Sequence, residues 1–494
     1  MTASGPVTRR HLLTGAAWVG LAMAVPAGIA GAATFPADRA AAIVRRIRVP
    51  RIPPRVLAVA DFGGSGDGVT DDSAAIGRAI AACAQAGGGR ILLPPGTCLS
   101  GPIRLRSNME LHVPAGCRLK FLADPARYLP VVATRWEGVE LMGYHPLIYA
   151  HGEHDIAVTG GGIIDGSADD ETWWPWKGPW AGRYGDTVVA ERQVGDRTRL
   201  FEMAEKGVPP EQRVFGAGSR LRPPLFQPYR CRNVLVEGVT ITNSPFWLLH
   251  PVECESVTFR SVTCSSHGPN NDGIDPESCV DVLIDGCTFD TGDDCIAIKA
   301  GRNADGRRIG KPCENIVIRN CHMKDGHGGI AIGSEMTGGV RNVFVQDCVM
   351  DSPHLIWALT IKTNAYRGGR AEDIHLDRIK VGTVDKTFVQ IWLFYEEGEG
   401  GAFVPSVERV TVSNSTVAST GRVLLVRGRK DSPVRGLVLD KVTVVREKTP
   451  SVVIDAVNVG LRDVTLAGKP WRTADLASLP GLDSITCDKW AVCR

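Results

Sequence analysis

Short runs of alternating apolar and polar residues recur along the chain, and they share one nine-residue pattern. Each run begins with a polar residue, continues as apolar–x–apolar, passes two polar positions and ends as apolar–x–apolar. Side chains of a β-strand alternate between its two faces, so the pattern predicts two short strands joined by a bend. The runs start at residues 155, 233, 256, 281, 315, 342, 373, 409, 436 and 458.

From residue 233 onward, the starts of these runs are 22 to 36 residues apart. A unit of this size cannot bury an apolar face alone, so successive units must stack on one another. We therefore expect an all-β, single-domain fold, a right-handed parallel β-helix with one coil per repeat. A β-propeller is the alternative, but its blades need about 40 residues or more and four antiparallel strands.

One helix is expected before the repeats, within residues 70–89, because alanine dominates there and a glycine run ends the segment. It would cap the N-terminal end of the stack, which would otherwise expose unpaired strand edges. We expect the β-helix to span residues 56–480, after a linker at 34–55 and before a tail at 481–494.

The repeat pattern fails between residues 165 and 222. Long irregular insertions in compact domains usually form walls or lids, so we expect this insertion to wall a cleft. Its tryptophans would stack on sugar rings, block one end of the cleft or pack the loop against the β-helix. They are Trp173, Trp174, Trp176 and Trp180.

The first 33 residues have the pattern of an export signal. Adjacent arginines in "TRRHLL" precede an apolar stretch that ends in small residues, "AGIAGAA". This order is typical of a twin-arginine signal peptide cleaved near Ala32 or Ala33, and a membrane anchor is the alternative. We expect the mature protein to be exported, and to be periplasmic or secreted.

The net charge and the cysteine positions restrict the possible ligands and disulfides. A formal net charge of +2 provides no general basic field for nucleic acid, so an anionic ligand would need local Lys and Arg residues. The 14 cysteines would suggest disulfides in an exported protein, but twin-arginine substrates usually fold before export, in a reducing compartment. Cys287, Cys321 and Cys348 share one inward strand position and should stack in the core, whereas Cys487 and Cys493 are the expected disulfide. No Cys/His spacing resembles a zinc site.

The stretch "NNDGIDPESCVDVLIDGCTFDTGDDCIAIK", residues 270–299, places aspartates at the ends of short β-like runs. Aligning these runs with the two that follow gives one inward column, made of Ile274, Ile296, Ile330 and Leu359. In this register Asp272 lies beside Asp294, and Asp293 lies beside His327, on strands about 4.8 Å apart.

Aspartates at such positions are often turn residues or calcium ligands. Three carboxylates and an imidazole on one face favour acid–base chemistry instead, because like charges at this distance raise the pKa of one member. Lys362, in the same outward-facing region, offers a cation for a carboxylated ligand.

The motifs "NNDGIDP", "TGDDCIAIK" and "DGHGGIAIGSE" resemble the Asn-x-Asp, Gly-Asp-Asp and Gly-His-Gly motifs of glycoside hydrolase family 28, the polygalacturonases and their relatives. The similarity runs from about Phe62 to Val444 and includes "DGVTDDSAAI", "GGIIDG" and "RPPLFQPYRC". The segments "SPFW", "GRNADGRRIG" and "FYEEG" are most similar to the bacterial exo-type branch. The resemblance implies a pectin-lyase-like β-helix that hydrolyses galacturonosyl bonds with inversion.

The resemblance also implies roles for individual residues. Asp293 would be the general acid that protonates the leaving oxygen, and Asp272 and Asp294 would hold and deprotonate the attacking water. Inverting enzymes usually keep acid and base about 6.5–9.5 Å apart to admit this water. His327 would tune the acid or contact substrate, and Lys362 would bind a substrate carboxylate.

One motif departs from the family pattern. The family's Arg-Ile-Lys is Thr360-Ile361-Lys362 here, and threonine cannot replace the charge of the arginine. The substrate is then less acidic, or the activity is reduced, or another arginine binds the carboxylate. The candidates are Arg302, Arg307 and Arg367.

Two further residues are candidates for substrate binding. Asn270 should order the turn that presents Asp272. Tyr395 either lines the cleft or belongs to an exposed acidic loop, and the surrounding "WLFYEEGEGG" favours the loop.

Two other functions stay open. A pectate-lyase-type elimination would need calcium and a basic residue, and we expect no basic residue at the centre of the aspartate cluster. A non-catalytic carbohydrate-binding β-helix would bind ligand without turnover. We expect a pectic polysaccharide or oligogalacturonide substrate, no cofactor or metal, no nucleic-acid partner, no membrane association after signal cleavage, and a monomer.

Overall fold

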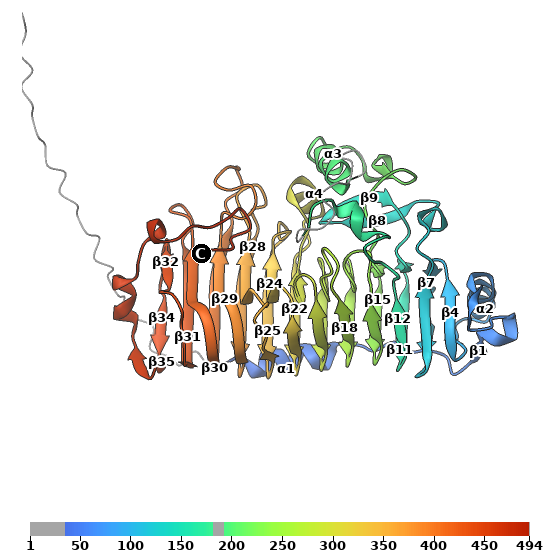
Figure 1. The fold of residues 1–494 in the computed structure, drawn as a ribbon, viewed down its shortest axis with the longest axis horizontal. Coiled ribbons are helices and arrows are strands. Elements are labelled where there is room, and N and C mark those ends of the chain that lie inside the picture. Colours follow the sequence, from blue (N-terminus) through green and yellow to red (C-terminus); the bar gives the residue numbers. More distant parts are fainter. Residues whose placement is uncertain (1–34, 181–191, 494) are drawn as a thin grey trace, which may run out of the picture. The chain divides into compact units, whose positions relative to one another are not determined.

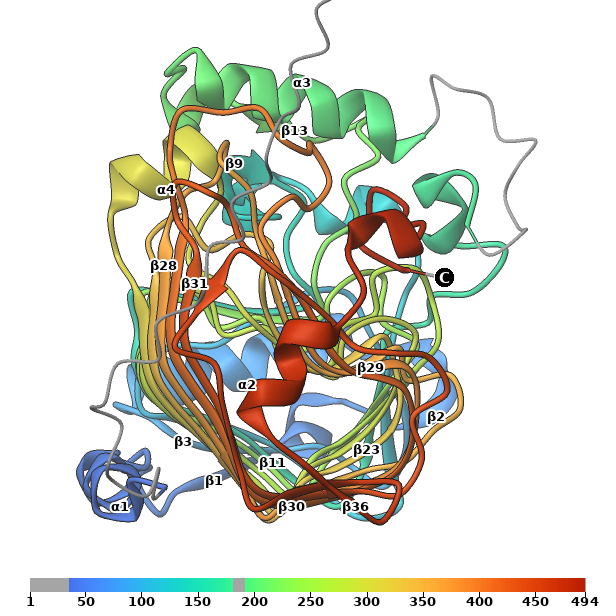
Figure 2. The ribbon, with the colours of Figure 1, turned by 90° about the vertical axis from the view of Figure 1, so that its left-hand side faces the viewer.

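The computed structural model describes residues 35–180 and 192–493, and the expected export signal lies outside them. Most of the described strands pair in parallel and form a β-helix, which confirms the fold expected from the repeats (Figure 1). Seen along its axis, the coils superimpose around one enclosed core (Figure 2). The strands follow one another on three faces of each coil.

The first face consists of β1 (Val56–Ala58), β3 (Gly89–Leu92), β6 (Met109–Val113), β11 (His154–Gly160), β15 (Arg232–Glu237), β17 (Glu255–Arg260), β19 (Val280–Asp285), β22 (Cys313–Arg319), β25 (Val340–Gln346), β28 (Arg370–Asp377) and the start of β30 (Ser406–Arg427). The second face consists of β2 (Asp67–Asp71), β4 (Gly96–Ser100), β7 (Cys117–Phe121), β12 (Ile163–Asp165), β16 (Thr240–Thr242), β18 (Thr263–Ser266), β20 (Thr288–Thr291), β23 (His322–Asp325), β26 (Val349–Met350) and the start of β29 (Lys380–Trp392).

The third face carries the aspartates of interest at its edge. It consists of β5 (Ile103–Arg104), β10 (Ile148–His151), β14 (Phe226–Tyr229), β21 (Ile296–Ile298), β24 (Gly328–Gly333), β27 (Trp357–Lys362), the end of β29, the end of β30 and β32 (Val452–Ile454). Single bridges through Leu249 and Ile274 continue this face between β14 and β21.

The remaining strands belong to the C-terminal coils or lie outside the β-helix. They are β31 (Val434–Val444), β33 (Ala456–Val457), β34 (Gly460–Arg462), β35 (Val464–Leu466), β36 (Lys469–Trp471), and, outside the β-helix, β8 (Val132–Trp136), β9 (Val139–Gly143) and β13 (Val214–Phe215). Strands β8 and β9 form an antiparallel hairpin to which β13 is added.

The bends of the repeat have a local cause. The first and sixth residues of each nine-residue unit have a positive φ, for example Asn315 (62°) and Asn320 (55°). Asparagine, aspartate and glycine tolerate this left-handed conformation best, and a single residue in it turns the chain sharply. The sixth position, such as Asn320, is therefore the corner between the first and second faces, whereas the first position, such as Asn315, bends the strand within the first face.

The helices cover the ends and the outside of the stack. They are α1 (Ala37–Arg46), α2 (Ser73–Gln85), α3 (Gln193–Glu205) and α4 (Asn303–Ile309), with short 3₁₀ helices η1 (Val59–Phe62), η2 (Pro125–Tyr128), η3 (Trp174–Lys177), η5 (Pro210–Gln212), η6 (Thr473–Ser478) and η7 (Leu482–Ser484). As expected, α2 lies at the N-terminal end, where its Ile76, Ala79 and Cys83 join the central core (Figure 1).

Two segments are more ordered than their composition suggested. Residues 34–55, expected to be a linker, contain α1, whose Ala40 and Ile43 pack on Phe344 of the first face. The insertion at 165–222 contains α3, because Leu200 and Ala204 are four residues apart and meet Trp136 in a small separate core.

The cysteines follow the expectation. Cys287, Cys321 and Cys348 are buried and unpaired on successive coils, and Cys487 forms a disulfide with Cys493. Among the described residues, no helix is long and apolar enough to span a membrane.

Candidate active site

The aspartates gather where the chain passes from the second face to the third. Asp293 and Asp294 lie between β20 and β21, and His327 lies between β23 and β24. The pairings Ile274–Ile296, Ile296–Ile330 and Ile330–Leu359 confirm the inward column expected from the sequence.

Asn271, rather than Asn270, holds the turn before Asp272. The buried amide of Asn271 accepts a hydrogen bond from the Gly268 N–H (2.9 Å) and donates to the carbonyls of Ser244 (3.0 Å) and Phe246 (3.1 Å). The Asn270 side chain instead accepts a hydrogen bond from Arg222 (2.8 Å), a residue at the end of the insertion. Nothing in the sequence distinguishes Asn270 from Asn271, so their different hydrogen-bonding roles could not be predicted.

Asp293 and His327 are the accessible members of the site. His327 Nδ1 lies 3.0 Å from Asp293 Oδ1, with the side chains 41% and 20% exposed, so both can reach a substrate. Asp272 and Asp294 are almost fully buried below them, with side chains 5% and 2% exposed.

Two lysines neutralise part of the buried negative charge. Lys362 Nζ lies 2.7 Å from Asp294 Oδ2, and Lys299 Nζ lies 3.6 Å from Asp275 Oδ1 and 3.9 Å from Asp272 Oδ2. Lys299 therefore lies at the centre of the acids, where no basic residue was expected. Its outward position, two residues after Ala297, was the available sequence signal. We call these seven residues the aspartate cluster: Asp272, Asp275, Asp293, Asp294, His327, Lys299 and Lys362.

Burial and charge determine where the protons of the cluster lie. Burial is the main cause that raises the pKa of Asp272 and of Asp275 well above the ordinary value, and neighbouring carboxylates add to it against the opposing charge of Lys299. Burial acts in the same direction on Asp293, but the charge and hydrogen bond of His327 outweigh it, and the pKa of Asp293 is lowered. Burial opposes protonation of His327, yet Asp293 raises the pKa of this imidazole. The accessible pair thus holds its proton on the histidine.

The carboxylates are closer than the usual spacing for inversion. Asp272, Asp293 and Asp294 each place one oxygen within 4.8 Å of the others, because two of them are sequence neighbours and Asp272 lies on the adjacent strand. Separations of about 6.5–9.5 Å are usual for inverting enzymes. The stereochemistry therefore needs its own test.

Three such oxygens could also contact a divalent cation. The ammonium groups of Lys299 and Lys362 already lie against the same carboxylates, at 3.9 Å and 2.7 Å. They supply the positive charge that a metal would otherwise provide here. The expectation of a metal-independent site stays a prediction.

The arginines proposed to replace the family arginine already have partners. Arg302 and Arg367 are buried, and both lie within 3.0 Å of Glu396 and Glu397. Arg307 donates to the Tyr366 carbonyl (3.0 Å) and its guanidinium lies 3.6 Å from the centre of the Phe403 ring. We call the following residues the arginine network: Arg197, Arg302, Arg367, Glu137, Glu335, Glu396 and Glu397.

Tyr395 lies beside the aspartate cluster, and its side chain does not belong to an exposed acidic loop. Its half-buried ring lies 5.4 Å from Lys362 Nζ, and the adjacent Glu396 and Glu397 are bound by the arginine network. Burial raises the pKa of the Tyr395 phenol. Thr360 is fully buried and accepts a hydrogen bond from Gln390 (3.4 Å), so it does not face an open cleft.

The tryptophans of the insertion pack within the protein. Trp173 and Trp176 contact each other and Tyr144, with ring centres 4.9 Å to 6.3 Å apart. Trp174 donates a hydrogen bond to the Ser244 carbonyl (2.9 Å). These contacts favour the packing interpretation for Trp173, Trp174 and Trp176.

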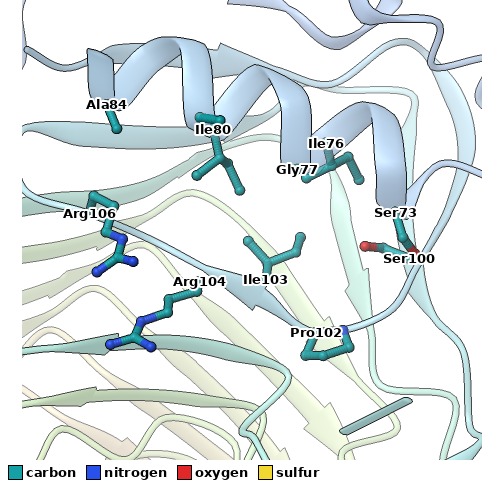
Figure 3. A pocket seen from close by; sticks show the side chains of 11 residues that line it. Ser73, Ile76, Gly77, Ile80, Ala84, Ser100, Pro102, Ile103, Arg104 and Arg106 are labelled. Atoms are coloured by element: carbon teal, nitrogen blue, oxygen red, sulfur yellow. The ribbon is translucent and has the colours of Figure 1, made fainter. Parts of the chain in front are cut away.

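Two other hollows lie away from the aspartate cluster. One, of about 460 Å³, lies between α2 and β5 and is lined by Ile76, Ile80 and Ile103 on its apolar side and by Arg104 and Arg106 (Figure 3). A second, of about 510 Å³, is lined by polar residues near the end of α1, including Arg46 and Asp281. Neither contains a residue of the cluster.

Comparisons with known proteins agree with the motifs. The sequence model described as glycosyl hydrolases family 28 matches residues 215–461, and one described as rhamnogalacturonase A/epimerase, pectate lyase-like, matches residues 56–112. A hyperthermoactive exopolygalacturonase from Thermotoga maritima superimposes with a TM-score of 0.85, 44% identity, and coverage of 89% of this chain and 97% of that one.

Two curated relatives are more distant in sequence. A probable polygalacturonase of Vitis vinifera is 25% identical, and the match covers 78% of this chain and 74% of the relative. An exo-poly-alpha-D-galacturonosidase of Dickeya chrysanthemi is 26% identical over 74% of this chain and 63% of its own length. The β-helix, the three motifs and these matches together show that the chain belongs to glycosyl hydrolases family 28 and is an O-glycosyl hydrolase.

Proposed function

We propose that this protein hydrolyses α-galacturonosyl linkages of pectic polysaccharides or oligosaccharides and removes sugars from the chain end. The 44% identity to an exopolygalacturonase over most of both chains supports this activity and the exo mode. The observation that carries the proposal is the arrangement of the aspartate cluster, with one accessible acid–imidazole pair above two buried carboxylates.

In this proposal the proton held on His327 passes to Asp293, and Asp293 donates it to the glycosidic oxygen as the bond to the anomeric carbon breaks. The raised pKa of the imidazole keeps this proton in the pair until substrate is bound. A water molecule attacks the anomeric carbon, and its proton passes to the Asp272–Asp294 pair. One sugar gains the water hydroxyl and the other gains the proton, so the products are two free sugars.

We propose inversion at the anomeric carbon. Asp272 and Asp294 are buried below the accessible Asp293–His327 pair, so they are better placed to hold water than to form a bond with the sugar. Proton NMR of the first-formed products would show the β-anomer for inversion. A first-formed α-anomer would contradict it and indicate a covalent intermediate on a carboxylate.

The central Lys299 does not favour elimination. Burial opposes its charge, but Glu335 and the aspartates raise its pKa, so this lysine is a poor base. We would follow reducing ends and ultraviolet absorbance with saturated pectic oligosaccharides. Monosaccharide release without absorbance is expected. A growing absorbance would indicate a lyase, and binding without any product would indicate a carbohydrate-binding protein.

We also propose export of the folded monomer by the twin-arginine route. The 12 buried, unpaired cysteines support folding in a reducing compartment, because oxidation during folding would compete with their burial. Cell fractionation with and without a Lys-Lys replacement of Arg9 and Arg10 would test the route, and light scattering would test the monomer.

A further inference from the structure

The cluster leaves open how a substrate carboxylate is bound. The cations that act most strongly on Asp293 are His327, Lys362 and Lys299, and each of these already lies within 4 Å of a carboxylate. The buried arginines of the arginine network are also paired. A galacturonosyl unit brings one negative charge per sugar, so an available cation near Asp293 would be needed to accept it.

Lys177 meets this requirement. It is half-buried at the end of η3, and it makes no hydrogen bond or ion pair with any residue in the described part of the chain. The carboxylates around it are occupied, since Glu137 lies 2.7 Å from Arg197 and Asp293 lies 3.0 Å from His327.

The packing of η3 directs Lys177 toward the catalytic turn. Trp174 lies directly on Gly268, because a Cβ placed on this glycine would be 2.2 Å from the indole ring. Gly268 in turn touches Gly292, the residue before Asp293, since a Cβ there would be 2.5 Å from the Gly268 carbonyl oxygen. Residues three apart in a 3₁₀ helix lie on the same side, so Lys177 projects on the side of Trp174.

The electrostatic surroundings agree with this placement. Burial, followed by the charge of Arg222, lowers the pKa of Lys177, whereas Glu137 and Asp293 act in the opposite direction. Lys177 therefore lies among other cationic side chains and within electrostatic range of Asp293. A bound anion would relieve this repulsion.

We propose that Lys177 forms a carboxylate-binding subsite beside the aspartate cluster, which takes the carboxylate of a galacturonosyl unit next to the scissile bond. The subsite rests on the proposed function. It supplies from the insertion the positive charge that Thr360 lacks on the third face. Lys177 thereby selects acidic over neutral or methyl-esterified sugars.

Lys177→Met, Lys177→Arg and Arg220→Met test the proposal. Arg220 is the matched control, because its guanidinium belongs to the same insertion but lies over the Trp176 ring, 4.9 Å from the ring centre. For oligogalacturonate, Lys177→Met should raise KM by about tenfold to a hundredfold, as expected for a lost charge-assisted hydrogen bond. Lys177→Arg should recover most of this loss, and Arg220→Met should stay near the wild type. Methyl-esterified oligogalacturonate should lose the dependence on Lys177.

Calorimetry with trigalacturonate separates this proposal from the proposed function. Suppose that the wild type hydrolyses galacturonides and that Lys177→Met binds and hydrolyses them equally well. The subsite is then wrong, and the proposed function stands. If the wild type hydrolyses none of them, the function is wrong. Unchanged trigalacturonate binding by a folded Lys177→Met, or an equal loss in Arg220→Met, would also overturn the subsite.

Discussion

The aspartate cluster and the arginine network are two buried groups of charges that share a border at Lys299 and Glu335, 3.3 Å apart. In the network each carboxylate has a guanidinium within 3.2 Å, for example Glu396 with Arg367 at 2.6 Å. The cluster likewise holds four carboxylates and three cationic side chains, but its Asp275 has no hydrogen-bond partner among the described residues for either oxygen. Carboxylates that are fully paired with guanidinium groups fix the local structure, and incompletely paired carboxylates beside an accessible edge hold protons for chemistry.

The largest effect is expected from Asp293→Asn. The amide keeps the size of the side chain but cannot donate a proton to the leaving oxygen, so kcat should fall by about a thousandfold. Binding of trigalacturonate should persist, as measured by calorimetry. A rate within tenfold of the wild type would show that another group supplies the proton.

Arg367→Met should break the network without touching the cluster. Glu396 and Glu397 would lose a buried guanidinium at 2.6 Å and 2.7 Å, and breaking such a pair costs about 3–5 kcal/mol. The midpoint of urea unfolding should fall clearly. Arg260→Met, which removes a solvent-accessible ion pair with Glu237, is the control and should change it little. Equal shifts in the two variants would contradict the comparison.

His327→Gln should change the pH profile more than the protein's stability. The raised pKa of His327 means that the pair keeps its proton to higher pH and loses it as the pH rises through that value. Without the imidazole, Asp293 alone loses its proton at lower pH, so the alkaline limb of kcat/KM should move to lower pH. We expect a loss of about tenfold to a hundredfold in rate. If the alkaline limb of the kcat/KM profile does not move, a group other than His327 is responsible for it.

The smallest effect is expected from Asp275→Asn. The raised pKa of Asp275 means that the folded chain binds this proton more tightly, so wild-type stability falls as the pH rises from the ordinary aspartate pKa toward the raised one. Asparagine does not titrate, so the Asp275→Asn variant does not lose stability in this way. Its melting temperature should match the wild type near pH 4 and exceed it by roughly 2 °C at pH 7. A lower value at pH 7 would show that a charged Asp275 stabilises the site.

The register of the site was predictable because strand periodicity is strict. The order of Ile274, Ile296 and Ile330 places Asp272 beside Asp294 and Asp293 beside His327 without further information. Ion-pair partners were not predictable in the same way. Whether Lys362 faces the substrate or Asp294 depends on how its flexible side chain is packed, and that depends on residues distant in sequence.

Contacts between charged or polar side chains that are distant in sequence were missed for the same reason. Arg222 reaches Asn270 from 48 residues away, and Arg302 meets Glu396 from 94 residues away. No periodic pattern links such positions. The composition of the acidic loop at Tyr395 suggested exposure, because the arginines that bind it lie elsewhere in the chain.

The left-handed residues of the repeat have a consequence for how this molecule tolerates change. Both left-handed positions lie inside the nine-residue unit, whose length is constant, while the spacing between units varies from 22 to 36 residues. All added or deleted residues must therefore fall on the remaining part of each coil, which includes the third face and its loops. Evolution can lengthen or shorten the loops beside the third face one coil at a time, and the neighbouring coils keep their alignment.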